Sequence, residues 1–147
     1  MIAIASDHAG FPLKEEIKKF LEEKNIEFID CGAHSTDSVD YAKFAQMACL
    51  KVTEGYADKA ILCCGTGIGI SMAANKVKGI RAAVCSDPLS AHLTKLHNNA
   101  NIIAFGARIV GIETAKAIVD AYLDTEYEGG RHQRRVDMIA DIENENL

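Results

Sequence analysis

The chain has 147 residues, of which 48% are hydrophobic and 25% are charged, a balance typical of one globular domain spanning 1–147 with its own core. The net charge of −5 argues against a general affinity for nucleic acid. The start at Met1 shows no leader-like segment, and no stretch approaches the roughly 18 apolar residues of a membrane helix. We therefore expect a cytoplasmic protein that does not contact membranes.

Strand-like and helix-like segments alternate along the whole chain. Short apolar runs predict five strands, over 2–6, 26–29, 59–64, 80–85 and 101–105. Apolar residues at helical spacing predict six helices, over 11–24, 39–54, 67–77, 88–97, 112–123 and 131–143. This alternation predicts an α/β fold, a single doubly wound domain with a five-stranded parallel sheet and helices on both faces, Rossmann-like or flavodoxin-like.

Three polar clusters follow predicted strands. Asp7 and His8 come after the first strand, Gly65–Gly69 after the third, and Gly106–Arg108 after the fifth. Because ligands of such sheets bind beyond the carboxyl ends of the strands, we expect the three clusters to meet at one edge.

The turn Gly65–Gly69 joins a strand to a helix, where its backbone N–H groups can converge on an anion. It matches neither the dinucleotide fingerprint nor a P-loop, so an unliganded tight turn is the alternative. Cys64 stands at the lip of this turn, where it is either a thiolate base or an inert buried thiol. Thr66 is placed either to cap the helix or to present its hydroxyl to a ligand.

The chain has five cysteines, an odd number, and none of them form a C-x-x-C motif. This predicts reduced thiols that are mostly buried. Cys63 and Cys64 should point to opposite faces of their strand and not pair.

Other polar residues allow a functional and a structural interpretation. Asp7 and His8 either address a sugar and a phosphate or form a helix cap with an exposed histidine. His97 is, on its own, best explained as a solvated residue at a helix end.

Arg131 and Arg135 are four residues apart, so both can reach one phosphate, although a solvated basic face is the alternative. The same helix has a narrow apolar face that we expect to pack on a second subunit, formed by Val136, Ile139 and Ile142.

With these features in this order, the chain resembles the ribose-5-phosphate isomerase B family, which is related to the galactose-6-phosphate isomerase subunits. The resemblance covers essentially the whole chain. It rests on Ser6 to Gly10, Val39 to Tyr41, Cys64 to Gly69, His97 and Asn98 with Asn101, Phe105 to Arg108, and Gly130 to Arg135. One branch of the family has a glutamate base where this chain has Ile70, so the chain resembles the thiol branch.

The resemblance implies the interconversion of ribose 5-phosphate and ribulose 5-phosphate, in the pentose phosphate pathway, through an enediolate and without a metal or organic cofactor. Cys64 would be the base, Thr66 would shuttle protons at the oxygens, and His97 would open the sugar ring. Backbone N–H groups would hold the enediolate charge, namely those of Gly65, Gly67, Ile68 and Gly69.

The resemblance also assigns the binding residues. Asn98 and Asp7 would hold the sugar, Tyr41 would line the site, and the phosphate would be held by His8, Arg108, Arg131 and Arg135. The site would be shared across a homodimer, with a tetramer as the alternative assembly. The alternatives for function are isomerisation of a six-carbon aldose phosphate (allose or galactose 6-phosphate) and a non-catalytic module that binds phosphate or a nucleotide.

Overall fold

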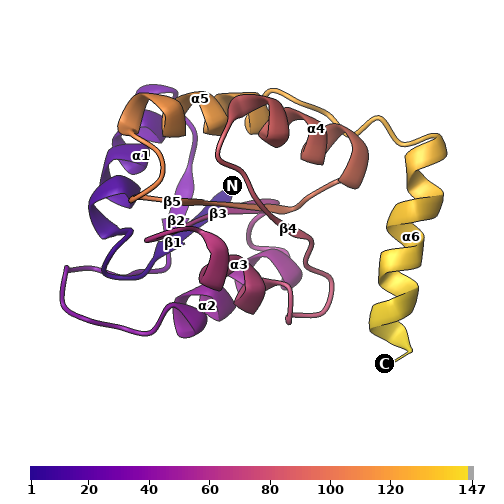
Figure 1. The fold of residues 1–147 in the computed structure, drawn as a ribbon, viewed down its shortest axis with the longest axis horizontal. Coiled ribbons are helices and arrows are strands. Elements are labelled where there is room, and N and C mark those ends of the chain that lie inside the picture. The colour runs from indigo at the N-terminus through magenta and orange to yellow at the C-terminus, as the bar shows by residue number, and fades with distance from the viewer. Residues whose placement is uncertain (146–147) are drawn as a thin grey trace.

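The computed structural model describes residues 1–145 and contains one five-stranded, all-parallel sheet (Figure 1). The sheet order is β2-β1-β3-β5-β4. The strands are β1 (Ile2–Ser6), β2 (Phe28–Asp30), β3 (Lys59–Cys64), β4 (Ala82–Val84) and β5 (Ile102–Gly106). The predicted α/β fold with a parallel sheet is therefore confirmed.

Helices cover both faces of the sheet, as Figure 1 shows. One layer holds α1 (Phe11–Glu23), α4 (Pro88–Asn98) and α5 (Ile112–Leu123). The other layer holds α2 (Tyr41–Thr53) and α3 (Ile68–Ala74). None of the described helices is long and apolar enough to cross a membrane.

The strands read as continuous apolar runs because both faces of the sheet are buried. In β3, for example, Ile61 and Cys63 belong to the core under α1, α4 and α5, whereas Leu62 and Cys64 belong to the core under α2 and α3. The two adjacent cysteines thus lie on opposite faces, as predicted, and all five cysteines are free.

The strand order departs from the flavodoxin order, because β5 lies between β3 and β4. All five residues of β5 are buried, whereas Val84 of β4 is 39% exposed. The more apolar strand thus occupies the interior of the sheet, and the short β4 forms an edge.

Two predicted boundaries were wrong around residue 75. The predicted helix 67–77 ends at Ala74, and the predicted strand 80–85 shortens to β4. The cause is the side chain of Asn75, which accepts from the Ala82 N–H at 2.8 Å and donates to the Ala82 carbonyl at 2.9 Å. These bonds fold the segment back as a loop instead of continuing the helix.

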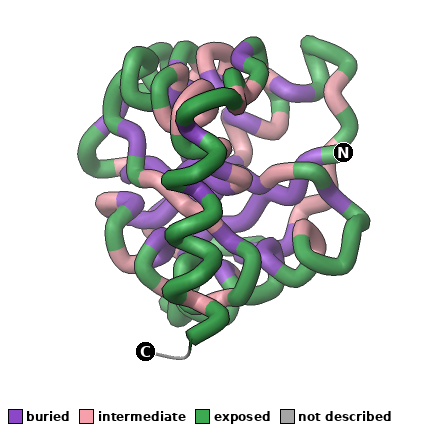
Figure 2. Tube along the Cα trace, turned by 90° about the vertical axis from the view of Figure 1, so that its right-hand side faces the viewer, coloured by how far each residue is buried: buried purple, intermediate pink, exposed green. Residues whose placement is uncertain are grey.

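The last helix, α6 (Arg131–Asn144), follows Gly129 and Gly130 and lies beside the body of the molecule (Figures 1 and 2). It packs against α4 and buries Val136. Ile139 and Ile142 remain 49% and 60% exposed and line a groove of about 760 Å³ between α6 and the β4 side. The apolar face predicted for this helix is therefore not covered within one chain.

Candidate active site

A pocket of about 270 Å³ opens at the carboxyl edge of the sheet, where the carboxyl ends of the strands meet. It collects residues that follow β1, β3 and β5, which confirms that the three polar clusters share one edge. Eight of the predicted site residues line it together with Ala9, namely Asp7, His8, Tyr41, Cys64, Gly65, Thr66, Gly69 and Arg108.

Cys64 ends β3 and lies 5% exposed at the base of this pocket. The backbone N–H of Gly67 donates to its Sγ at 3.0 Å. Gly67 has φ 81°, a left-handed conformation that glycine adopts without strain and that turns this N–H back toward the sulfur. The N–H dipole presents its positive end to Sγ, the polarity that a thiolate requires.

The other cysteines have a different environment. Burial raises the pKa of Cys49 to about 12 and that of Cys85 to about 11, and burial also raises the pKa values of Cys31 and Cys63. These four thiols are therefore inert at neutral pH.

Thr66 serves the first of the two uses that the sequence left open. Its Oγ1 accepts a hydrogen bond from the Ile68 N–H at 3.1 Å, which stabilises the start of α3. The hydroxyl hydrogen remains able to donate toward the pocket.

Tyr41 packs against the glycine turn from the start of α2. A Cβ added to Gly69 would lie only 2.7 Å from the Tyr41 Cζ, so glycine is needed for this close approach. The ring thereby forms one wall of the pocket.

Asp7 and His8 are held by backbone bonds. Asp7 is buried, and its Oδ1 accepts from the Gly10 N–H at 2.9 Å in the turn before α1, but it does not cap the helix, whose N-cap residue is Gly10. The N–H of Val39 donates to Nδ1 of His8 at 3.1 Å. Nδ1 also lies 3.2 Å from the Val39 carbonyl oxygen, and these two contacts hold the ring beside the pocket.

Arg108 supplies positive charge at the mouth of the pocket. Its backbone N–H donates to the Gly65 carbonyl at 2.9 Å, and its guanidinium lies over Gly65, so that a Cβ added there would be 3.4 Å from Arg108 Cζ. The side chain is thus directed toward the glycine turn.

The remaining predicted side chains lie at the opposite, amino edge of the sheet. His97 and Asn98 end α4, which runs back from the carboxyl edge to the start of β5. Arg131 and Arg135 lie exposed on α6. One chain therefore does not bring these four residues to Cys64. Ile68 is exposed at the start of α3, and neither it nor Gly67 lines the pocket.

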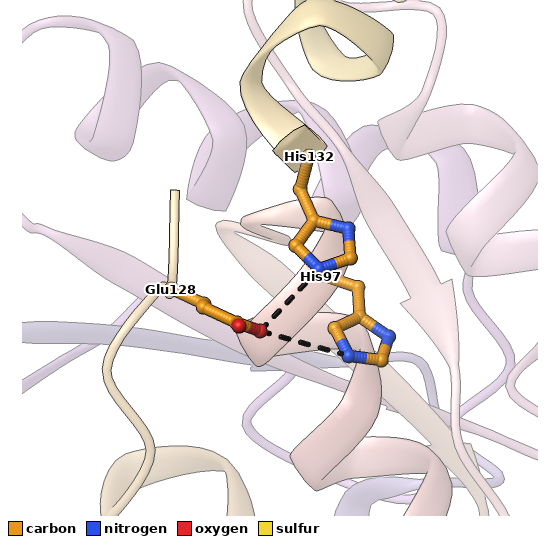
Figure 3. Close-up of side chains that lie close together, drawn as sticks. All are labelled: His97, Glu128 and His132. Atoms are coloured by element: carbon orange, nitrogen blue, oxygen red, sulfur yellow. Dashed lines mark ion pairs between the residues drawn. The ribbon is translucent and has the colours of Figure 1, made fainter. Parts of the chain in front are cut away.

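The amino edge holds a cluster that sequence reasoning missed (Figure 3). The rings of His97 and His132 stack with centroids 4.3 Å apart and planes at 19°. Glu128 Oε2 lies 3.3 Å from His132 Nε2 and 3.9 Å from His97 Nε2. The i,i+4 spacing of Glu128 and His132 was the available signal, but nothing in the sequence connected the pair to His97.

The comparisons agree with this architecture. Residues 2–139 match the model of a family described as Ribose/Galactose Isomerase. The chain belongs to this family. Its members include ribose-5-phosphate isomerase B of Escherichia coli, 54% identical over 97% of this chain and 95% of that protein. A putative sugar phosphate isomerase of Bacillus subtilis is 48% identical over 99% of both chains.

Solved structures of the family superpose closely on this one. Ribose-5-phosphate isomerase B of Clostridium thermocellum has a TM-score of 0.98 at 49% identity and 99% coverage of both chains. The enzyme of Mycoplasma genitalium with bound ribulose-5-phosphate has a TM-score of 0.94 at 43% identity, over 98% of this chain and 96% of that chain.

Proposed function

We propose that this chain interconverts ribose 5-phosphate and ribulose 5-phosphate, a reaction of the pentose phosphate pathway. The observation that carries the proposal is the Cys64 sulfur, 3.0 Å from a backbone N–H donor in a pocket that also holds His8 and Arg108. An acid–base group, an oxyanion cradle and a phosphate-binding cation are what an aldose–ketose isomerisation needs. The names of the most similar relatives support the same substrate.

The chemistry is a proton transfer between adjacent carbons. The Cys64 thiolate takes the proton from C2 of the open-chain aldose, and the electron pair of that bond forms the C1–C2 double bond of an enediolate. The negative charge on oxygen is stabilised by backbone N–H groups of the glycine turn, while Thr66 moves a proton between the two oxygens. Return of the proton to C1 gives the ketose and regenerates the thiolate.

The phosphate is bound by groups at the pocket mouth and by the arginines of α6. The His8 ring and Arg108 bind the phosphate from the carboxyl edge, while Arg131 and Arg135 form a two-guanidinium clamp. Asp7, Tyr41 and Asn98 orient the sugar, and His97 opens the furanose ring as an acid–base group.

We assign the site to a homodimer. Each chain carries one set of site residues at its carboxyl edge and a second set on α4 and α6. A two-fold axis would bring the first set of each chain to the second set of its partner, which gives two equivalent sites per dimer. The uncovered apolar residues of α6 support such contact. Two dimers would assemble into a tetramer without changing this site.

The deciding experiment is incubation with ribose 5-phosphate in heavy water. An isomerase working through an enediolate incorporates deuterium at carbon in the recovered sugar, because the abstracted proton exchanges with solvent. A protein that binds phosphate or a nucleotide without catalysis leaves the carbon-bound hydrogen in place, and this result would refute the proposal.

The six-carbon alternative is supported by the family description, which includes galactose isomerases. Running the same exchange assay with allose 6-phosphate and galactose 6-phosphate compares the substrates directly. We expect ribose 5-phosphate to exchange fastest, and a faster hexose would reassign the substrate. The five unpaired cysteines support a reducing, cytoplasmic location.

A further inference from the structure

Three metal-binding side chains converge at the amino edge of the sheet. His97 comes from the last turn of α4, Glu128 from the loop before α6, and His132 from the first turn of α6 (Figure 3). One ligand atom from each lies within 4.8 Å of the others. Donors around a tetrahedral zinc ion are about 3.3 Å apart. The Glu128 oxygen already meets this spacing at 3.3 Å from His132 and approaches it at 3.9 Å from His97.

The second observation is the state of His132. This residue is 8% exposed, and its Nε2 is buried without a hydrogen-bond partner. Its nearest polar atom is Glu128 Oε2 at 3.3 Å, but the two do not form a hydrogen bond, so the buried nitrogen gains from a better-placed partner. Because Nε2 faces the Glu128 carboxylate, a cation between the two groups would satisfy both.

Access from solvent also fits a metal ion. The side chains of His97 and Glu128 are 36% and 53% exposed, so an ion can enter and keep a water ligand. Arg131 and Arg135 lie on the same helix but are exposed, and solvent and salt screen their charge.

From this geometry we propose that His97, Glu128 and His132 form a site for a divalent transition metal, with Zn²⁺ as the best match. Two imidazoles, one carboxylate and a water molecule make a four-coordinate zinc site. An imidazole binds metal in its ring plane, so the stacked rings must open by a small movement of α6, which contacts the body mainly through α4.

The metal would inhibit the enzyme. Coordination occupies the lone pair of His97 Nε2, and a ring-opening acid–base group needs that lone pair. The binding site stands on the geometry alone, whereas inhibition rests on the proposed function. The ion is therefore a regulator and not a cofactor of the isomerisation.

The direct test is equilibrium dialysis of the full-length protein against Zn²⁺ in the presence of a competing chelator. We expect one ion per chain, with at least about 10-fold weaker binding in His132→Gln and in Glu128→Gln. Glu128 is exposed, so its variant folds even if the buried His132 variant does not. His34→Gln, which removes an exposed histidine elsewhere, is the matched control and should bind as the wild type does.

Thiols are the competing ligands, so Cys64→Ala and a Co²⁺ spectrum complete the test. Retained Zn²⁺ affinity in Cys64→Ala and a Co²⁺ spectrum without a thiolate charge-transfer band support the site. Affinity that is lost with Cys64, or unchanged in Glu128→Gln, overturns it. Zn²⁺ should also inhibit the wild type at lower concentration than Glu128→Gln. Binding at the cluster without inhibition would overturn the regulatory effect alone and would count against ring opening by His97.

Discussion

Cys63 and Cys64 show how adjacent positions in one strand give two thiols different surroundings. Both are almost completely buried, but Cys63 faces the core under α1 and α5, and burial raises its pKa far above neutrality. Cys64 faces the pocket and accepts the Gly67 N–H. The order of the strand and the turn predicted this difference, because alternate residues face opposite sides of a sheet.

We predict that Cys64→Ala lowers kcat by about 10³-fold and leaves KM nearly unchanged, because a proton-transfer group acts mainly in the transition state. Steady-state kinetics with ribose 5-phosphate measure both constants. Cys63→Ala is the matched control and should keep kcat while lowering stability by about 1 kcal/mol. Comparable loss of kcat in the two variants would count against Cys64 as the base.

We expect Asp30 to contribute to the pH dependence of the stability of the fold. Lys14 is completely buried, and its Nζ donates to Asp30 Oδ1 at 2.6 Å, while Lys18 pairs with Oδ2 at 2.8 Å. Although burial opposes the shift, the hydrogen bonds from Lys14, Lys18 and the Gly32 N–H lower the pKa of Asp30 below its ordinary value. A lowered pKa in the folded state stabilises the fold above the unfolded pKa, and this stabilisation is lost as the pH falls through the folded value.

We therefore predict that Asp30→Asn lowers stability by about 3 kcal/mol at pH 7, because it removes the nearest counter-charge of the buried Lys14 ammonium and leaves only Glu15 at 3.8 Å. The difference in the free energy of unfolding between variant and wild type should become smaller below about pH 4. Urea unfolding at several pH values measures this difference. The control Glu16→Gln removes a more exposed ion pair with Lys19 and should change the free energy of unfolding little at any pH. A pH-independent difference would contradict the assignment.

At the scale of elements, the alternation of apolar runs predicted all five strands and all six helices. It did not predict the strand order, because any parallel strand can follow a crossover helix to either neighbouring position. Of β4 and β5, the more completely buried strand, β5, takes the inner position. This choice depends on tertiary packing, which the apolar pattern does not reveal. The ends near Asn75 were missed because a side chain, and not a break in the apolar pattern, ends the helix.

Asn75→Ala tests whether the Asn75 side chain ends α3 and holds the loop that leads to β4. Losing two hydrogen bonds to Ala82 should lower the free energy of unfolding by about 1–2 kcal/mol, since both backbone groups of Ala82 lose a partner. Chemical denaturation measures it, and Lys76→Ala, the next exposed residue, should have no effect. Equal losses of unfolding free energy in the two variants would mean that the Asn75 hydrogen bonds do not stabilise this junction.

For the whole molecule, the sequence predicted the carboxyl-edge half of the site from topology. The other half could not be placed, because the position of α6 depends on tertiary contacts with α4. The resemblance assigned His97, Arg131 and Arg135 to the site, but a single chain leaves them on the far side of the sheet. The proposed homodimer would bring the two sets of residues together.

Mixing inactive variants tests this arrangement. Cys64→Ala damages the carboxyl-edge set, and the double variant Arg131→Ala with Arg135→Ala damages the α6 set. After the two proteins are unfolded and refolded together, half of the dimers are hybrids with one intact site, so about a quarter of wild-type activity should return. Each variant refolded alone is the control. No recovery, despite hybrid dimers detected by a tag, would place the site within one chain.

The placement of these two sets has a consequence for the enzyme in dilute solution. If the proposed homodimer is the active form, a single protomer carries both sets of residues but cannot bring them together, because they lie at opposite edges of the sheet. Specific activity should then fall once the protein is diluted below the dissociation constant of its dimer. Below that dissociation constant, the rate of ketose phosphate formation would therefore rise more steeply than in proportion to the protein concentration.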